Sequence, residues 1–188
     1  MQANRHPAHR TRSRAAALAL AVAAALALVA AGCGGEGSGS APTGPAPEAT
    51  LTAYFPTRDR EAIVPVRVPR PAAGGALESA LAALAQGPSD PALGPALPGG
   101  TRVLGARVEG GTARVDLSGD FAAAYPSGGS AAEIAALAPL VFTATEVPGV
   151  ERVLVTVEGR TPDVPSQLDL AAPLARTDFP PEIVKARP

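Results

Sequence analysis

An unbroken apolar run from Ala15 to Ala31 ends at Gly32 and the only cysteine of the chain, Cys33. The leader before it carries arginines and no acidic residue, and small residues directly before a cysteine are the layout of a bacterial lipoprotein signal. We therefore expect residues 1–32 to be removed and Cys33 to become the lipidated first residue. The rest of the chain, residues 33–188, then lies on the extracytoplasmic face of the cell membrane.

An uncleaved membrane anchor is the alternative interpretation of the apolar run, because about 17 to 20 apolar residues can span a bilayer. Ala30 stands where the lipoprotein pattern more often has leucine. Ser13 separates Arg12 from Arg14, so the leader lacks an adjacent arginine pair and favours a general secretory signal over a twin-arginine one. Both interpretations place the rest of the chain outside the cytoplasm.

Removal of the leader limits the chemistry that remains. Both histidines, His6 and His9, leave with it, and the one thiol is acylated. Histidine-dependent triads, cysteine nucleophiles and zinc sites built from Cys and His are therefore excluded.

Removal of the leader also changes the net charge. The sixteen basic residues fall to twelve while all seventeen acidic residues stay, so the charge is about −5. Because the arginines are scattered among acids, we do not expect nucleic acid as a partner. We also expect no cofactor and no metal.

Composition divides the rest of the chain into three parts. Residues 33–49 are rich in Gly, Ser and Pro and predict a tether, whose 16 or so flexible residues reach roughly 20–24 Å. Residues 50–160 carry the only credible core and suffice for one small domain. The Pro-rich tail, residues 161–188, is expected to pack partly along the domain and then fray.

Strands are predicted where apolar residues alternate with polar ones, in residues 51–55, 64–68, 101–109, 112–118 and 153–157. The first two form a hairpin in which Pro65, lacking a ladder donor, lies at an edge. The next two form a hairpin about Gly110-Gly111, with Leu104, Ala106 and Val108 facing inward.

Two helices are predicted between these strands. Leucines at helical spacing indicate a helix from Ala76 to Gln86, which Gly87-Pro88 ends. Ser130 with Glu133 looks like a capping box that opens the second helix, and Pro139 within it predicts a kink or a break. The expected fold class is α+β, a single small domain with a mixed sheet of about four to five strands packed by two helices.

Six motifs, in order along the chain, resemble a known domain. They are Leu51-Thr52-Ala53-Tyr54-Phe55-Pro56, Gln86-Gly87-Pro88, Leu97-Pro98-Gly99-Gly100-Thr101, Ala113-Arg114-Val115-Asp116-Leu117-Ser118 with Phe121, Val141-Phe142-Thr143-Ala144-Thr145-Glu146, and Pro148-Gly149-Val150. Together they resemble the GerMN domain of GerM-type sporulation and spore germination lipoproteins. The resemblance implies a small domain similar to the ring-building modules of envelope complexes, and a non-enzymatic assembly function. GerM itself resembles two such domains, whereas this chain has one.

Asp116 and Asp120, with Ser118, are the candidate catalytic residues, because a carboxylate pair is what glycoside hydrolysis requires. Asp116 belongs to the polar face of a strand, however, and Asp120 follows Gly119 in a turn. The chain has no Trp, two Tyr and four Phe, which makes a sugar-stacking platform hard to build. We therefore expect a protein that is not an enzyme, with a cell-wall hydrolase as the weaker alternative.

The expected function is that of a lipid-anchored envelope scaffold, with the membrane and other envelope proteins as partners. A ligand-binding envelope lipoprotein is the alternative, and it would need a concave pocket with converging polar groups. The candidate interaction face is the side of the last strand opposite its valines, with Leu154 as the contact to test. This face consists of Arg152, Leu154, Thr156 and Glu158.

Overall fold

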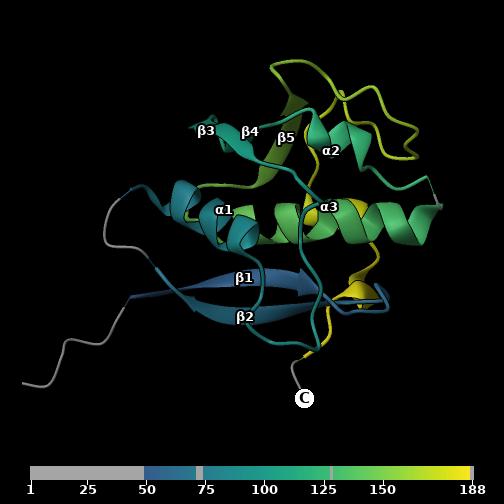
Figure 1. The fold of residues 1–188 in the computed structure, drawn as a ribbon. Coiled ribbons are helices and arrows are strands. Elements are labelled where there is room, and N and C mark those ends of the chain that lie inside the picture. The colour runs from purple at the N-terminus through teal and green to yellow at the C-terminus, as the bar shows by residue number, and fades with distance from the viewer. Residues whose placement is uncertain (1–48, 71–73, 128, 187–188) are drawn as a thin grey trace, which may run out of the picture. The chain divides into compact units, whose positions relative to one another are not determined.

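The structure, a computed structural model, describes residues 49–70, 74–127 and 129–186. The expected signal peptide, Cys33 and all but the last residue of the tether lie outside these residues. In the folded part, helices α1 (Ala76–Gln86) and α3 (Ser130–Ala144) lie between a two-stranded and a three-stranded sheet (Figure 1). The α+β class is confirmed, and the five strands form two sheets rather than one.

The smaller sheet is the predicted first hairpin. Strands β1 (Thr50–Pro56) and β2 (Ile63–Pro69) pair antiparallel along their whole length. Each strand of a two-stranded sheet has one free edge, so Pro65 is tolerated opposite Tyr54 without its ladder donor. Both helices pack on this sheet through β1.

The larger sheet has the order β3-β4-β5. Strands β3 (Val103–Glu109) and β4 (Thr112–Leu117) form the predicted hairpin, in which Gly110 and Gly111 take φ values of 54° and 78°. These positive values are those of a tight two-residue turn and favour glycine at both positions. Strand β5 (Arg152–Val157) pairs parallel with β4 after the chain has crossed through helices α2 (Asp120–Ala123) and α3.

The helices follow the prediction in position more closely than in detail. The bounds of α1 are the predicted ones. The capping box is wrong, because Gly129 occupies the N-cap of α3 with no side-chain cap, and Glu133 bonds elsewhere. The predicted break at Pro139 is also wrong, since α3 is one helix that continues through this buried proline. Proline there still leaves the carbonyl of Ala135 without its helical donor.

The core lies between the two sheets and is built from buried residues of β1, β2, β4, β5, α1 and α3, whereas β3 contributes only the partly buried Val103 and Ala106. Strand β3 departs from the expected pattern in exposure: Ala106 and Val108 lie on the helix side of the sheet, opposite the buried Val115 and Ala113, but Val108 is 45% exposed and Leu104 51%. Two features explain this exposure. β3 is an edge strand that pairs with β4 alone, and a bulge between Val103 and Gly105 shifts the register beside Leu104.

The tail contributes to the core more than the prediction of partial packing and fraying implied. Four of its apolar side chains are at most 6% exposed: Leu170, Leu174, Phe179 and Ile183. Two short 3-10 helices, Arg176–Asp178 and Pro181–Ile183, hold the last of these. The tail therefore belongs to the folded domain through residue 183.

Candidate functional site

The three-stranded sheet presents one face to the helices and the other outward. Ala113, Val115 and Val153 point toward the helices and are fully buried. The residues between them point outward, where they are exposed or half-buried. They form three rungs across β3, β4 and β5, called here the open face: Gly105–Asp116–Thr156, Arg107–Arg114–Leu154 and Glu109–Thr112–Arg152.

The structure brings three of the four predicted interaction residues onto this open face. Arg152, Leu154 and Thr156 occupy alternate positions of β5, with Leu154 half-buried opposite Arg114. Glu158 lies beyond the strand, in a turn, with a φ of 51° and its N–H donating to the carbonyl of Leu117 at 2.9 Å. It therefore lies at the end of the sheet and not in a rung.

One carboxylate, that of Glu109, binds two of the arginines on the open face. Glu109 accepts from Nε of Arg107 at 2.6 Å and faces Nε of Arg114 at 3.1 Å. The hydrogen bond from Arg107 is the main reason that the pKa of Glu109 lies below its usual value. Because these side chains are largely exposed, the ion pairs add little to stability. Their effect is to hold two arginines in place on the face.

A hollow of about 380 Å³ opens on this face where Gly105 lacks a side chain. Its polar floor includes Asp116, whose Oδ1 accepts from Oγ1 of Thr156 at 2.7 Å and from the N–H of Gly159 at 2.8 Å. These bonds tie the turn after β5 to the middle of the sheet. The hollow is lined by Gly105, Ala106, Arg107, Arg114, Asp116, Thr156 and Gly159.

The two aspartates of the candidate hydrolase are each used by the chain itself. Asp116 binds Thr156 and Gly159, as above. Asp120 accepts from Oγ of Ser118 at 3.0 Å, and the Ser118 Oγ itself accepts from the N–H of Arg102 at 3.0 Å. Both carboxylates thus fix turns beside the strands.

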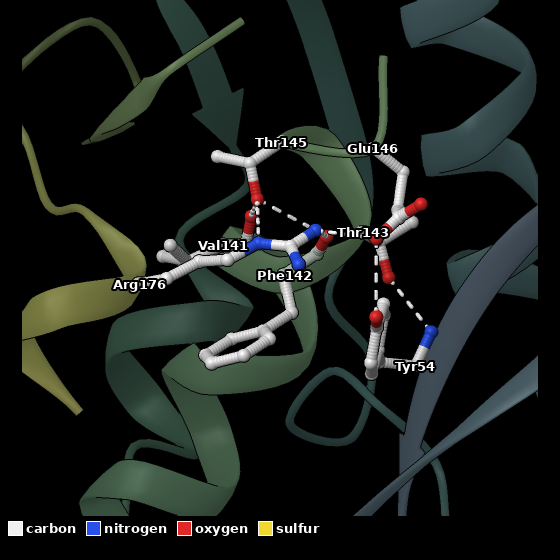
Figure 2. Close-up of polar contacts among 7 residues, drawn as sticks. All are labelled: Tyr54, Val141, Phe142, Thr143, Thr145, Glu146 and Arg176. Carbon is white, nitrogen blue, oxygen red and sulfur yellow. Dashed lines mark hydrogen bonds and ion pairs between the residues drawn. The ribbon is translucent and has the colours of Figure 1, made fainter. Parts of the chain in front are cut away.

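A second cluster lies at the C-terminal end of α3, around Arg176 (Figure 2). The guanidinium donates to Oγ1 of Thr145 at 2.7 Å, to the carbonyl of Phe142 at 2.9 Å and to the Glu146 carboxylate at 2.6 Å. It also lies over the rings of Tyr54 and Phe142, 5.6 and 5.0 Å from their centroids. A cation at this end of a helix interacts favourably with its free carbonyls, so Arg176 fastens the tail to α3 and β1.

Two further bonds complete the Arg176 cluster. The hydroxyl of Tyr54 donates to Glu146 at 3.1 Å, and its N–H donates to Oγ1 of Thr143 at 2.8 Å. Burial, and then the neighbouring Glu146 carboxylate, raise the pKa of Tyr54 above its usual value. The phenol is therefore a neutral donor at physiological pH, which suits a structural role.

A third polar cluster joins the tail to the start of α3. The Glu133 carboxylate is 4% exposed and accepts from the hydroxyl of Ser166 and from the N–H groups of Gln167 and Leu168, the last two at 3.0 and 3.2 Å. Burial alone would raise the pKa of Glu133, but these donors outweigh it and hold the pKa below its usual value. Burial likewise raises the pKa of the neighbouring Tyr125 to about 12.

Arg176 was not among the predicted site residues, and Glu133 has partners in the tail instead of the predicted capping box. The partners of Arg176 at the end of α3 lie 30 to 34 residues away, and those of Glu133 lie 33 to 35 away. No local pattern marks such distant pairs. The sequence offered one signal, for Glu133: it is a charged residue within an otherwise apolar helix, and a charged residue needs polar partners when it is buried.

Other features of the described residues are few. A groove of about 730 Å³ lies between the end of β2 and the end of α1, with Val66, Val68 and Ala83 among its lining residues. No group of three or more His, Cys, Asp or Glu side chains in the described part of the chain could hold a metal ion. Of the helices described, none is long and apolar enough to cross a membrane.

This geometry defines a small α+β domain in which two helices separate a two-stranded from a three-stranded sheet, with one sheet face left open. Residues 52–163 match the Germane family, described as sporulation and spore germination. The match covers more than half of the chain, and the chain belongs to this family. No curated protein matches it.

Solved structures of the same kind come from Bacillus subtilis. The tandem GerMN domains of the sporulation protein GerM align at a TM-score of 0.56 and 20% identity, over 70% of this chain and 47% of that one. The chain thus spans about half the length of the tandem structure. The first GerMN domain alone aligns at a TM-score of 0.53 and 18% identity, over 69% of this chain and 99% of that one. At these identities the likeness shows the fold, which is that of one GerMN domain.

Proposed function

We propose that this protein is a lipid-anchored module on the extracytoplasmic face of the cell membrane, where it assembles other envelope proteins and catalyses no reaction. The open face of the β3-β4-β5 sheet carries this proposal. It offers charged, hydroxyl and apolar groups on a rigid frame, whereas the carboxylates that could do chemistry are engaged in turns. The family's description supports a process of spore formation or germination.

Leu154 is the residue through which the open face can be tested. It is half-buried in the middle rung, between the strand edge and Arg114. A Leu154→Glu substitution places a carboxylate opposite that arginine, a favourable cross-strand pair, so the free energy of unfolding should change by about 1 kcal/mol or less. The apolar contact for a partner is lost at the same time.

The experiment is affinity recovery of envelope proteins with the full-length, membrane-extracted chain. Proteins that co-purify with the wild type should be lost with Leu154→Glu and retained with Ala82→Glu, a matched change on the exposed side of α1. Equal recovery with both variants would remove the open face from the interface. Hydrolysis of cell-wall glycan that disappears in Asp116→Asn would replace the scaffold with an enzyme.

Anchoring is a separate part of the proposal and rests on Cys33. Two or more acyl chains hold a protein stably to a bilayer, at about 0.8 kcal/mol per buried methylene, where one chain does not. Cys33→Ser should abolish labelling by a fatty-acid probe and release the protein from membranes. Labelling that persists in this variant would contradict the lipoprotein interpretation.

Ligand binding is the second candidate, favoured by the groove between β2 and α1. Its volume of about 730 Å³ lies within the range of small-molecule sites. Its lining is mostly apolar and includes Arg70 and Gln86, so it would suit an amphiphile whose polar head contacts these two residues. Native mass spectrometry of protein extracted from membranes should then show a bound small molecule that Ala83→Trp excludes. A wild-type spectrum with protein mass alone would remove this candidate.

A further inference from the structure

Strand β3 is an edge strand with an unusual surface. Among the described residues, the large hydrophobic side chains that stand exposed are Leu104 and Val108, and both belong to β3. The opposite edge of the same sheet is covered, because the tail residue Leu174 exchanges two 2.8 Å backbone bonds with Val153 of β5. A free edge with exposed apolar residues is where another strand adds to a sheet.

Gly105, between the two exposed residues, has no internal reason to be glycine. Its φ lies outside the left-handed region, so the backbone and the adjacent bulge do not require it. A Cβ built there would have no atom within 4 Å, so packing within the domain does not require it either. Glycine weakens a strand, and inside one it often marks the close approach of another chain.

We infer that β3 pairs antiparallel with the β3 strand of a second copy of this chain, with Ala106 at the two-fold axis. In a full-length overlap of Val103–Glu109 about this centre, Leu104 of each copy lies opposite Val108 of the other. Gly105 of each copy lies opposite Arg107 of the other. This goes beyond the proposed function, because it concerns the sheet edge and self-association, whereas the proposed assembly role uses the open face.

A free acceptor on the open face fits the same register. Arg107 of the second copy would cross the vacant position at Gly105 and enter the hollow of about 380 Å³, which Asp116 lines together with Arg107 and Arg114 of the first copy. Both bonds to Asp116 are made to Oδ1, and no described donor binds Oδ2. The apolar pairs, the missing side chain and the free carboxylate oxygen thus coincide in one symmetric arrangement. An unrelated extended segment would need to match all three separately.

The register is tested by disulfide cross-linking of the full chain in membranes. Directly opposed residues of antiparallel strands have Cα atoms about 4.5–5.5 Å apart, within the roughly 4.4–6.8 Å that a disulfide spans. On oxidation, Ala106→Cys should give at least fivefold more disulfide-linked dimer than Ala82→Cys or the wild type, whose own cysteine is Cys33. Val108→Cys alone should not link, but should link to co-expressed Leu104→Cys.

A second variant tests the role of Gly105. Adding Gly105→Gln to Ala106→Cys should lower the dimer yield at least fivefold with an unchanged melting temperature. Gly99→Gln, at another position with nothing within 4 Å of a built Cβ, should leave the yield unchanged. Three results would each overturn the inference. They are a dimer yield from Ala106→Cys no higher than that of the controls, a cross-link to a protein of different mass, and a dimer yield that Gly105→Gln leaves unchanged. Loss of partners in Leu154→Glu leaves this cross-link intact, which separates the two proposals.

Discussion

Single polar residues make the long-range connections between the tail and the rest of this domain. Arg176 holds the tail to α3 and β1, and Glu133 holds another part of the tail to the start of α3. Each has three or more partners contributed by distant parts of the chain. The strength of such a cluster depends on every donor being satisfied, so the loss of its central residue leaves several groups unpaired.

Arg176→Ala should lower the free energy of unfolding by about 2 kcal/mol. The variant loses two hydrogen bonds to the end of α3 and the contacts with two aromatic rings, while the half-exposed ion pair with Glu146 adds little. Urea denaturation measures the change, and Arg152→Ala, an exposed site, should shift it by less than about 0.5 kcal/mol. Equal changes in the free energy of unfolding for the two variants would show that the Arg176 cluster does not stabilise the fold.

Glu133→Gln should change how stability depends on pH. The folded pKa of Glu133 lies below its ordinary value of 4.5, so its charged form contributes stability above that pH and loses it as the pH falls through the folded pKa. The variant should be less stable than the wild type by about 2 kcal/mol at pH 7, with the difference shrinking in acid. Denaturation at several pH values tests this, with the exposed Glu182→Gln as control. A difference independent of pH would contradict the carboxylate's role.

Elements with local signals were predictable, and those that depend on distant pairing were not. The bounds of α1 followed from leucine spacing and the glycine that ends it, and both hairpins followed from alternation about a turn. The division into two sheets depends on which strands meet, which alternation does not encode. The exposure of Leu104 and Val108 was missed for the same reason, because a strand's pattern does not say whether it lies at an edge.

The tail is an element whose importance composition concealed. Its four buried apolar side chains contribute about 1.5–3 kcal/mol each, together comparable to the 5–15 kcal/mol that stabilises a typical domain. A chain ending at Arg160 should therefore lose cooperative unfolding by circular dichroism. A chain ending at Lys185 should retain it, because the buried anchors all precede that residue. Cooperative unfolding of the shorter chain would show that residues 50–160 suffice.

At the scale of the whole molecule, two helices support both sheets, and the second sheet keeps one face free for contacts. The sequence indicated that β5 would offer Arg152, Leu154 and Thr156 on one side. It could not indicate that Arg107, Arg114 and Asp116 would join them, because β4 and β5 are parallel neighbours joined by a long crossover. This composite face is the surface that we assign to partner binding.

Site-specific photo-cross-linking in living cells tests whether partners bind this face. A photoreactive amino acid in place of Leu154, in the full-length chain, should give light-dependent adducts with envelope proteins other than the chain itself. The same residue in place of Ala82 should not give these adducts. Adducts of equal yield at both positions, or none at Leu154, would contradict the assignment of the open face as the surface through which this protein assembles its partners.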